Sequence, residues 1–167
     1  WSICCSDRCG RAGCRITEDD PYAVVLGFAI ADGRAVTTRL AAQNHRPGDI
    51  AAIRLHHEEY AAAVAARDAL AMIATNRDFH LEIARAGGNA YYTDMFTRLL
   101  DEGRRILRLY YSSFNDMLPR PYVDEHEALI AAISQRAVDK ADRLAAAHAR
   151  QIIGHIQTAV SADARVN

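Results

Sequence analysis

Three histidines, His80, His126 and His148, stand at positions where a helical pattern predicts an apolar side chain. His80 lies four residues after Asn76, which puts these two side chains one turn apart on the same face of a helix. Because the three histidines belong to three different helical segments, their rings can converge on one point in the core of a helical bundle. Neutral imidazole is a common ligand of zinc, nickel, iron and copper. The pattern therefore predicts a shared metal site.

The competing interpretation is that each inward histidine is an ordinary core residue held by a hydrogen bond. A single inward histidine is more often such a residue than a metal ligand. Three of them need three separate partners, since a buried polar group without a partner costs about 1–3 kcal/mol. The other histidines are expected elsewhere: His45, His56 and His57 fall beside loops or on polar faces and are predicted at the surface.

The segments that must position these residues are predicted to be helical. Half of the 167 residues are hydrophobic, strong helix formers dominate, and runs of β-branched residues are almost absent. The length suits one domain with a real core. The sequence therefore predicts an all-α fold, an antiparallel bundle of about six to seven helices. Helices are expected over 22–42 (interrupted at 32–33), 50–66, 69–86, 90–113, about ten residues from 124, and 138–160.

Several details of these helices are also predicted. In the first helix, Val25 and Phe28 are assigned to the buried side. Asp49, Asn89 and Asp124 are the expected N-caps of the helices that follow them, because their side chains accept hydrogen bonds from free backbone N–H groups.

The helical domain is predicted to span 21–160, and the two ends of the chain are predicted to lie outside it. Residues 1–20 are expected to be a disordered leader or linker remnant, and 161–167 a frayed tail. The four cysteines, Cys4, Cys5, Cys9 and Cys14, all lie near the start. They lack the paired C-x-x-C spacing of a zinc knuckle, and a disulfide framework needs an oxidising compartment. We assign them no function.

The charge balance restricts the partners. Twenty basic and 21 acidic side chains give a net charge of −1, whereas nucleic-acid-binding modules usually carry a basic excess. No apolar stretch is long enough for a membrane span, and no signal-peptide core is present at the start. We therefore expect a cytoplasmic protein that makes no membrane contact and binds DNA poorly by itself.

Four motifs resemble those of a known family. Asn76-Arg77-Asp78-Phe79-His80, followed by Ala86-Gly87-Gly88-Asn89, is similar to the "D/N-x-x-F-H … A-x-G-N" pattern of the FCD domain, the C-terminal ligand-binding part of FadR-type GntR transcription regulators. Residues 124–133 resemble its "E-H-x-x-I-x-x-A-I" helix, and 141–152 its closing helix with one histidine. The resemblance covers about 22–157. Each motif is weak by itself, but their order and spacing together are specific.

The resemblance implies a function and a ligand set. The family metal ligands fall on Asn76, His80, His126 and His148, with asparagine in place of the usual aspartate. The resemblance further implies a divalent metal ion, zinc or nickel, and a small carboxylate effector bound beside it. It also implies a homodimer, with DNA held by a winged helix-turn-helix that this chain does not contain. Because asparagine is neutral, we expect weaker metal binding, with a bound carboxylate supplying the missing negative charge.

Three further residues are candidates for binding the effector. Arg104 flanks the apolar stripe of its helix and could clamp an organic acid through two hydrogen bonds, although a peripheral salt bridge is an equal alternative. His155 follows His148 by seven residues and projects from a similar side, with a solvated helix end as its alternative. Tyr92 lies on the apolar face of the predicted 90–113 helix.

Two other functions remain open at this point. A metalloenzyme could use three histidines and an open coordination position, but no H-E-x-x-H motif is present and Glu127 is turned 100° from His126 around the helix. A di-iron bundle fails because no glutamate stands three residues before a histidine. A metal-free helical interaction domain is the last alternative. The sequence favours a regulatory sensor that is not an enzyme.

Overall fold

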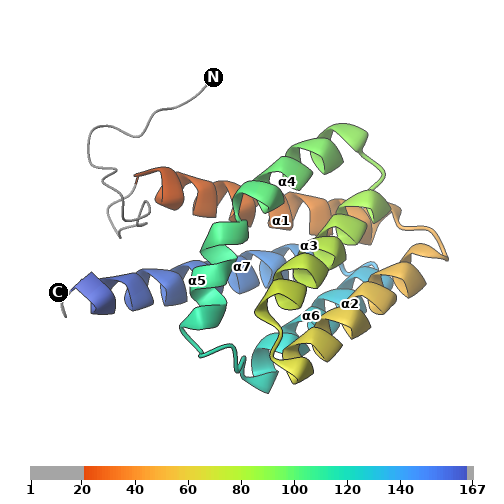
Figure 1. Ribbon diagram of the computed structural model, residues 1–167. Coiled ribbons are helices and arrows are strands. Elements are labelled where there is room, and N and C mark those ends of the chain that lie inside the picture. The colour runs from red at the N-terminus through yellow and green to blue at the C-terminus, as the bar shows by residue number, and fades with distance from the viewer. Residues whose placement is uncertain (1–20, 165–167) are drawn as a thin grey trace.

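The computed structural model describes residues 21–164, within which the chain forms seven α-helices and no strand (Figure 1). The all-α fold is therefore as predicted. The cysteines and the proposed leader lie outside the described residues. The helices are α1 (Pro21–Asn44), α2 (Asp49–Ala66), α3 (Ala69–Ala86), α4 (Ala90–Glu102), α5 (Arg104–Ser112), α6 (Arg120–Ser134) and α7 (Val138–Ala164).

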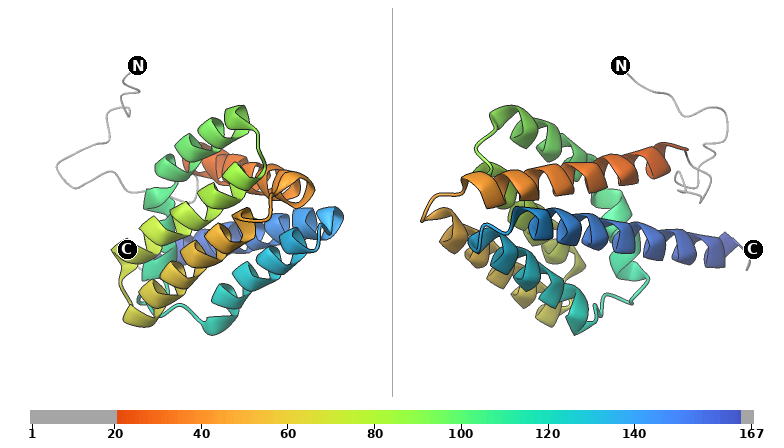
Figure 2. Two further views of the ribbon diagram at one scale, coloured as in Figure 1. Left: turned by 90° about the vertical axis from the view of Figure 1, so that its right-hand side faces the viewer. Right: turned by 180° about the vertical axis from the view of Figure 1, so that it is seen from behind.

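The two longest helices, α1 and α7, lie side by side and antiparallel, and they make the most extensive contact in the fold (Figures 1 and 2). The α2–α3 pair forms the next largest contact, and α6 packs on both α7 and α2. The chain then crosses from α3 through α4 and α5 to reach α6. Within 21–164 no helix combines the length and the low polarity that crossing a lipid bilayer requires.

The ends of α3 follow from local sequence. Asp68 accepts hydrogen bonds from the backbone N–H groups of Leu70 and Ala71 at 3.1 and 3.0 Å, which caps the first turn. At the other end, Gly88 has φ +70, a left-handed conformation that glycine adopts without strain. Asn89 then caps α4, as predicted, by accepting from the N–H of Tyr92.

Four predicted helix limits were wrong. The 90–113 helix is divided at Gly103, where an added Cβ would lie 2.6 Å from Ile30 Cδ1, so glycine permits the close approach of α1. The helix expected to be capped by Asp124 begins earlier, at Arg120, because Pro119 takes the N-cap position and Pro121 lies in the first turn, where proline is tolerated. In addition, Gly48 rather than Asp49 is the N-cap of α2, and α7 continues to Ala164.

The inner face of α1 also differs from the prediction. Val25 and Phe28 are 66% and 56% exposed, and α1 continues without interruption through Gly33. A Cβ on Gly33 would lie 2.6 Å from a ring carbon of Phe96, so this glycine provides the space that the buried Phe96 ring fills. The buried side of α1 carries small and polar residues instead, namely Ala31, Arg34, Thr37, Thr38, Ala41 and Ala42.

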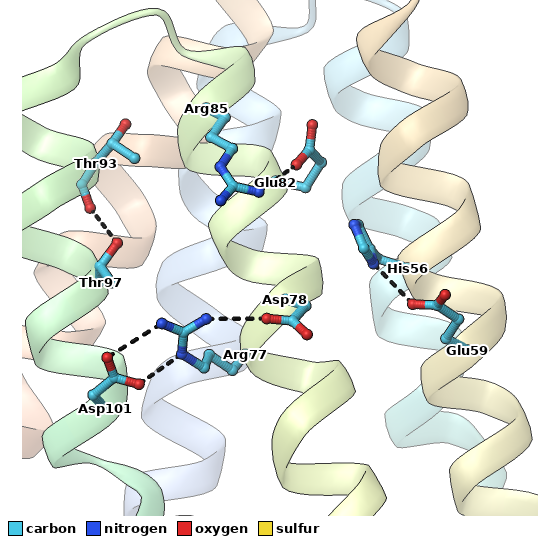
Figure 3. Close-up of polar contacts among 9 residues, drawn as sticks. All are labelled: His56, Glu59, Arg77, Asp78, Glu82, Arg85, Thr93, Thr97 and Asp101. Carbon is cyan, nitrogen blue, oxygen red and sulfur yellow. Dashed lines mark hydrogen bonds and ion pairs between the residues drawn. The ribbon is translucent and has the colours of Figure 1, made fainter.

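The core consists of aliphatic and aromatic side chains contributed by several of the described helices. At the surface, ion pairs join neighbouring helices. One such pair links α3 to α4: Arg77 Nε lies 2.6 Å from Asp101 Oδ1 and its NH1 lies 3.0 Å from Asp78 Oδ1 (Figure 3). Arg77 directly follows Asn76 on α3. Its ion pairs therefore hold the surface side of the helical turn from which the candidate ligands Asn76 and His80 project into the core.

Candidate metal centre

The three predicted histidines meet in the core. His80 comes from α3, His126 from α6 and His148 from α7, and all three side chains are buried. One ring nitrogen of each lies within 4.8 Å of the corresponding nitrogens of the other two. Ring centroids are separated by 5.2 Å for His80 and His126, 5.0 Å for His126 and His148, and 5.7 Å for His80 and His148.

Four ring nitrogens of these three histidines are buried without a hydrogen-bond partner among the described residues. They are His80 Nε2, both ring nitrogens of His126, and His148 Nε2. Buried polar atoms are nearly always paired, so a group of partnerless nitrogens at one point needs an explanation. A single metal ion would satisfy one nitrogen of each ring at once.

Neighbouring side chains hold these rings in place. His148 Nδ1 lies 2.7 Å from Glu125 Oε2, and this contact directs Nε2 toward the cluster. Phe79 stacks on His126 with centroids 4.2 Å apart and an interplanar angle of 15°, and Tyr60 lies 4.9 Å away from the same ring. A carboxylate hydrogen-bonded to the far nitrogen of a ligating histidine is a common feature of metal sites.

Burial keeps the three imidazoles in the form that binds metals. It is the main cause that lowers the pKa of His80 and of His126 well below the usual 6.5. Burial also lowers the pKa of His148, although the hydrogen bond with Glu125 opposes the effect. The positive charge of Arg34 acts in the same direction on all three rings. The histidines are therefore neutral near pH 7, with lone pairs free to coordinate.

Asn76 lies one turn before His80 on α3 and is 2% exposed. Its Nδ2 is buried without a partner among the residues described. A half-turn of the amide exchanges Nδ2 and Oδ1, so the same position can present a neutral carbonyl oxygen. The side chain is thus suited to be a fourth, uncharged ligand.

Two histidines predicted at the surface are buried instead. His45 Nδ1 lies 3.0 Å from the carbonyl oxygen of Ala41, at the end of α1. His57 Nε2 lies 3.2 Å from Glu127 Oε1, and its ring is 5.7 Å from that of His126. Helical spacing does not separate the adjacent His56 and His57, since each lies within one turn of the buried Ile53 and Tyr60, but only His57 is buried.

Arg34 is the functional candidate that the sequence analysis missed. Its side chain is 3% exposed, and its Nε has no hydrogen-bond partner among the described residues. Burial lowers its pKa to about 10, which leaves it charged, and the neighbouring Tyr111, Tyr60 and Tyr110 oppose the shift. A buried guanidinium that has no carboxylate partner in the described part of the chain is prepared to bind an anion. Its position on the same stripe as Ala31, Thr38 and Ala41 was the available sign.

The other three candidates for effector binding lie apart from the histidine cluster. Arg104 begins α5 and is exposed, and Tyr92 is half-buried on α4 beside Tyr91. His155 stacks on Phe114 with centroids 4.2 Å apart, and its Nε2 lies 2.9 Å from Ser113 Oγ. The structure groups none of them with His80, His126 and His148.

Comparison with known proteins identifies the family. The family model of the FCD domain matches residues 35–151, which include every candidate metal ligand. The chain belongs to the FCD domain family. The resemblance to the FCD domain of GntR-type regulators is therefore confirmed, whereas the FadR subfamily stays a prediction. A comparison with curated protein sequences gave no match.

A solved structure supports the fold of this FCD domain. The structure described as E. coli McbR/YncC matches with a TM-score of 0.72 and 20% sequence identity, covering 80% of this chain and 66% of that one. At this identity the likeness concerns the fold alone. The chain described here spans just under two thirds of the length of that protein. The FCD domain is a regulatory module rather than an enzyme.

Proposed function

We propose that this FCD domain is the effector-binding and dimerisation domain of a GntR-type transcription regulator, and that it senses a small organic acid at a metal-containing cavity. The observation that carries the proposal is the cluster of His80, His126 and His148, whose ligand atoms lie within 4.8 Å of one another and whose rings carry buried nitrogens without partners among the described residues. In this proposal Asn76 is the fourth ligand. A divalent ion, zinc or nickel, supplies a Lewis-acidic point to which a carboxylate oxygen can bind.

The effector half of the site is assigned to Arg34. Its buried guanidinium is charged and close enough to all three histidines to influence their pKa values. A carboxylate bound there gains charge-assisted hydrogen bonds, and it also compensates a buried positive charge whose Nε has no partner among the residues described. This assignment replaces Arg104 as the preferred anion-binding residue, because Arg104 is exposed at the start of α5.

Sensing requires that the ligand favour one state of the protein over another. Arg34 lies on α1, the histidines lie on α3, α6 and α7, and α1 and α7 share the largest helix contact. A ligand held between these helices changes how α1 packs on the others. We propose that this change alters the geometry of a homodimer, and that the operator DNA is held by a separate winged helix-turn-helix domain.

Metal analysis of the purified chain tests the first step. We expect near-stoichiometric zinc or nickel by inductively coupled plasma mass spectrometry, and a higher melting temperature when the ion is returned to chelator-treated protein. His80→Ala and His148→Ala should abolish both effects. The control is His56→Ala, because His56 is half-buried, pairs with Glu59 and takes no part in the cluster. Circular dichroism confirms that each variant is folded.

Two outcomes would contradict the proposal. Metal that binds equally well to the His80→Ala and wild-type chains places the ion elsewhere. A folded chain whose melting temperature is unchanged by zinc and by nickel has no such site. The oligomeric state, measured by light scattering after size-exclusion chromatography, separately tests the dimer, and a monomer at micromolar concentration contradicts that part.

A further inference from the structure

His57 of α2 lies beside the candidate metal centre but is not one of the ligands assigned above. The centroid of its ring is 5.7 Å from that of His126 and 5.9 Å from that of Phe79. The residue is 6% exposed, and its Nδ1 is buried without a hydrogen-bond partner among the described residues. Since buried polar atoms are nearly always paired, this nitrogen needs a partner that the protein side chains around it do not yet supply.

The other nitrogen of His57 contacts a carboxylate at the surface. Nε2 lies 3.2 Å from Oε1 of Glu127, and Oε2 of the same carboxylate lies 3.1 Å from NH1 of Arg54. Burial lowers the pKa of His57 below 6.5, although Glu127 opposes the effect, so the ring is neutral near pH 7 and carries a single proton. An ionised carboxylate only accepts hydrogen bonds, so this proton is on Nε2. Nδ1 is then left as a buried acceptor.

The neighbouring ring of His126 has the opposite requirement. Both of its nitrogens are buried, and neither has a hydrogen-bond partner in the part of the chain that the structure describes. A metal ion binds the lone pair of one nitrogen, so the proton of the neutral ring is on the other. His126 then has a donor without an acceptor, whereas His57 has an acceptor without a donor. One hydrogen bond between the two rings would satisfy both atoms.

We infer that His57 and Glu127 position His126 for metal binding: the N–H of His126 that does not face the ion donates to His57 Nδ1, and His57 Nε2–H donates to Glu127. This inference rests on the metal site of the proposed function. Two imidazoles joined by a hydrogen bond of about 3 Å have centroids roughly 5–5.5 Å apart, so the inference requires these rings to draw together by a few tenths of an ångström. Ligating histidines generally donate their second N–H to such a partner.

Two substitutions at residue 57 separate hydrogen bonding from packing. His57→Phe keeps an aromatic ring in the space but offers no acceptor, whereas His57→Asn places an amide oxygen close to the position of Nδ1. The matched control is His45→Phe. His45 is also buried, but its Nδ1 lies 3.0 Å from the carbonyl oxygen of Ala41 rather than beside the cluster. Thermal unfolding of the chelator-treated proteins verifies that each variant is folded.

The first measurement is zinc affinity, by competition with a chromophoric chelator. We expect His57→Phe to lower the affinity by about 10–100-fold, and His57→Asn to recover part of this loss. His45→Phe should bind zinc as the wild type does. Glu127→Ala, which removes the group that fixes the proton on Nε2, should weaken binding to a smaller extent, whereas Arg54→Ala should have no effect.

The second measurement is the tautomer of each ring, by long-range proton–nitrogen NMR correlation of the zinc-loaded chain. A purely structural role of His57 would not determine this readout. We expect the proton of His57 on Nε2 and a lone pair on Nδ1. We also expect a protonated second nitrogen on His126, with an N–H that exchanges slowly with water in the wild type and faster in His57→Phe.

Each outcome bears on the inference. It is wrong if His57→Phe binds zinc as tightly as the wild type, if His57→Phe and His57→Asn lose the same affinity, or if His57 in the zinc-loaded chain is protonated on Nδ1. In these three cases zinc still binds to the wild type, so the metal site of the proposed function stands. If the wild-type chain itself binds no zinc, the proposed function fails and this inference fails with it.

Discussion

Glu125 Oε2 lies 2.7 Å from Nδ1 of His148, although the two residues come from different helices and are 23 positions apart. This contact fixes the tautomer of His148 and turns its other nitrogen toward His80 and His126. The helix pair α6 and α7 therefore supplies two of the three imidazoles together with the carboxylate that orients one of them.

Replacement of Glu125 by glutamine should weaken metal binding without removing a ligand. The loss of a carboxylate partner from a ligating histidine usually lowers affinity by about 10–100-fold. The affinity for zinc can be measured by competition with a chromophoric chelator. Glu59→Gln is the control, because Glu59 pairs with His56 at the surface. Equal affinity in wild type and Glu125→Gln would show that the contact does not position the ligand.

The metal-free domain should lose stability when the pH falls below 6.5. Burial lowers the pKa values of His80, His126 and His148 from 6.5, so the unfolded chain takes up protons in this range while the folded chain does not. Each such histidine contributes a slope of up to about 1.4 kcal/mol per pH unit, with stability rising with pH. Urea unfolding between pH 7.5 and 5.5 measures the slope. A smaller slope in a folded His126→Phe chain is expected, and an unchanged slope contradicts the assignment.

Asn76→Asp should separate metal affinity from intrinsic stability. An anionic ligand strengthens the attraction for a divalent ion, so affinity should rise by at least about tenfold. Without metal the same carboxylate is buried beside neutral rings, and the melting temperature should fall. Calorimetric titration and thermal unfolding, each with and without zinc, check both effects. A variant that gains no affinity would show that residue 76 does not contact the ion.

Arg34→Met should abolish the response to carboxylates without destabilising the fold. Replacing a buried charge that has no ion-pair partner within the described residues by an apolar side chain of similar volume should be neutral or stabilising. An ordinary structural arginine would instead give a loss of stability. The shift in melting temperature on adding butyrate to the zinc-loaded protein is the readout. Arg34→Lys, which keeps the charge but loses the two-pronged hydrogen bonding, should restore part of it.

Gly33→Ala tests the packing of α1 on α4. The added methyl group would overlap the buried ring of Phe96, and such overpacking costs about 1–3 kcal/mol. Gly48→Ala is the control, because a Cβ there meets nothing within 4 Å and the residue has φ −82. Its unfolding free energy should stay the same or rise slightly. Chemical denaturation compares the two variants, and equal values would contradict the packing described.

The sequence was sufficient for the fold class and for the convergence of the histidines, because both depend on periodicity. It failed where packing between helices decides the outcome. The division at Gly103 depends on the approach of Ile30, and the burial of His57 depends on Glu127 of another helix. Arg34 was missed for the same reason, since a charged residue on a helix is normally at the surface and only the surrounding helices bury it.

Because Asn76 is neutral, the metal ion and the acid in the proposed site depend on each other for tight binding. A centre of three imidazoles and one amide carries no negative charge among its ligands, so the ion and the acid each complete what the other lacks. Coupling of this kind is reciprocal: the factor by which the acid tightens the metal equals the factor by which the metal tightens the acid. In this proposal the domain responds to the product of the metal and acid concentrations. It therefore changes state only when both compounds are present.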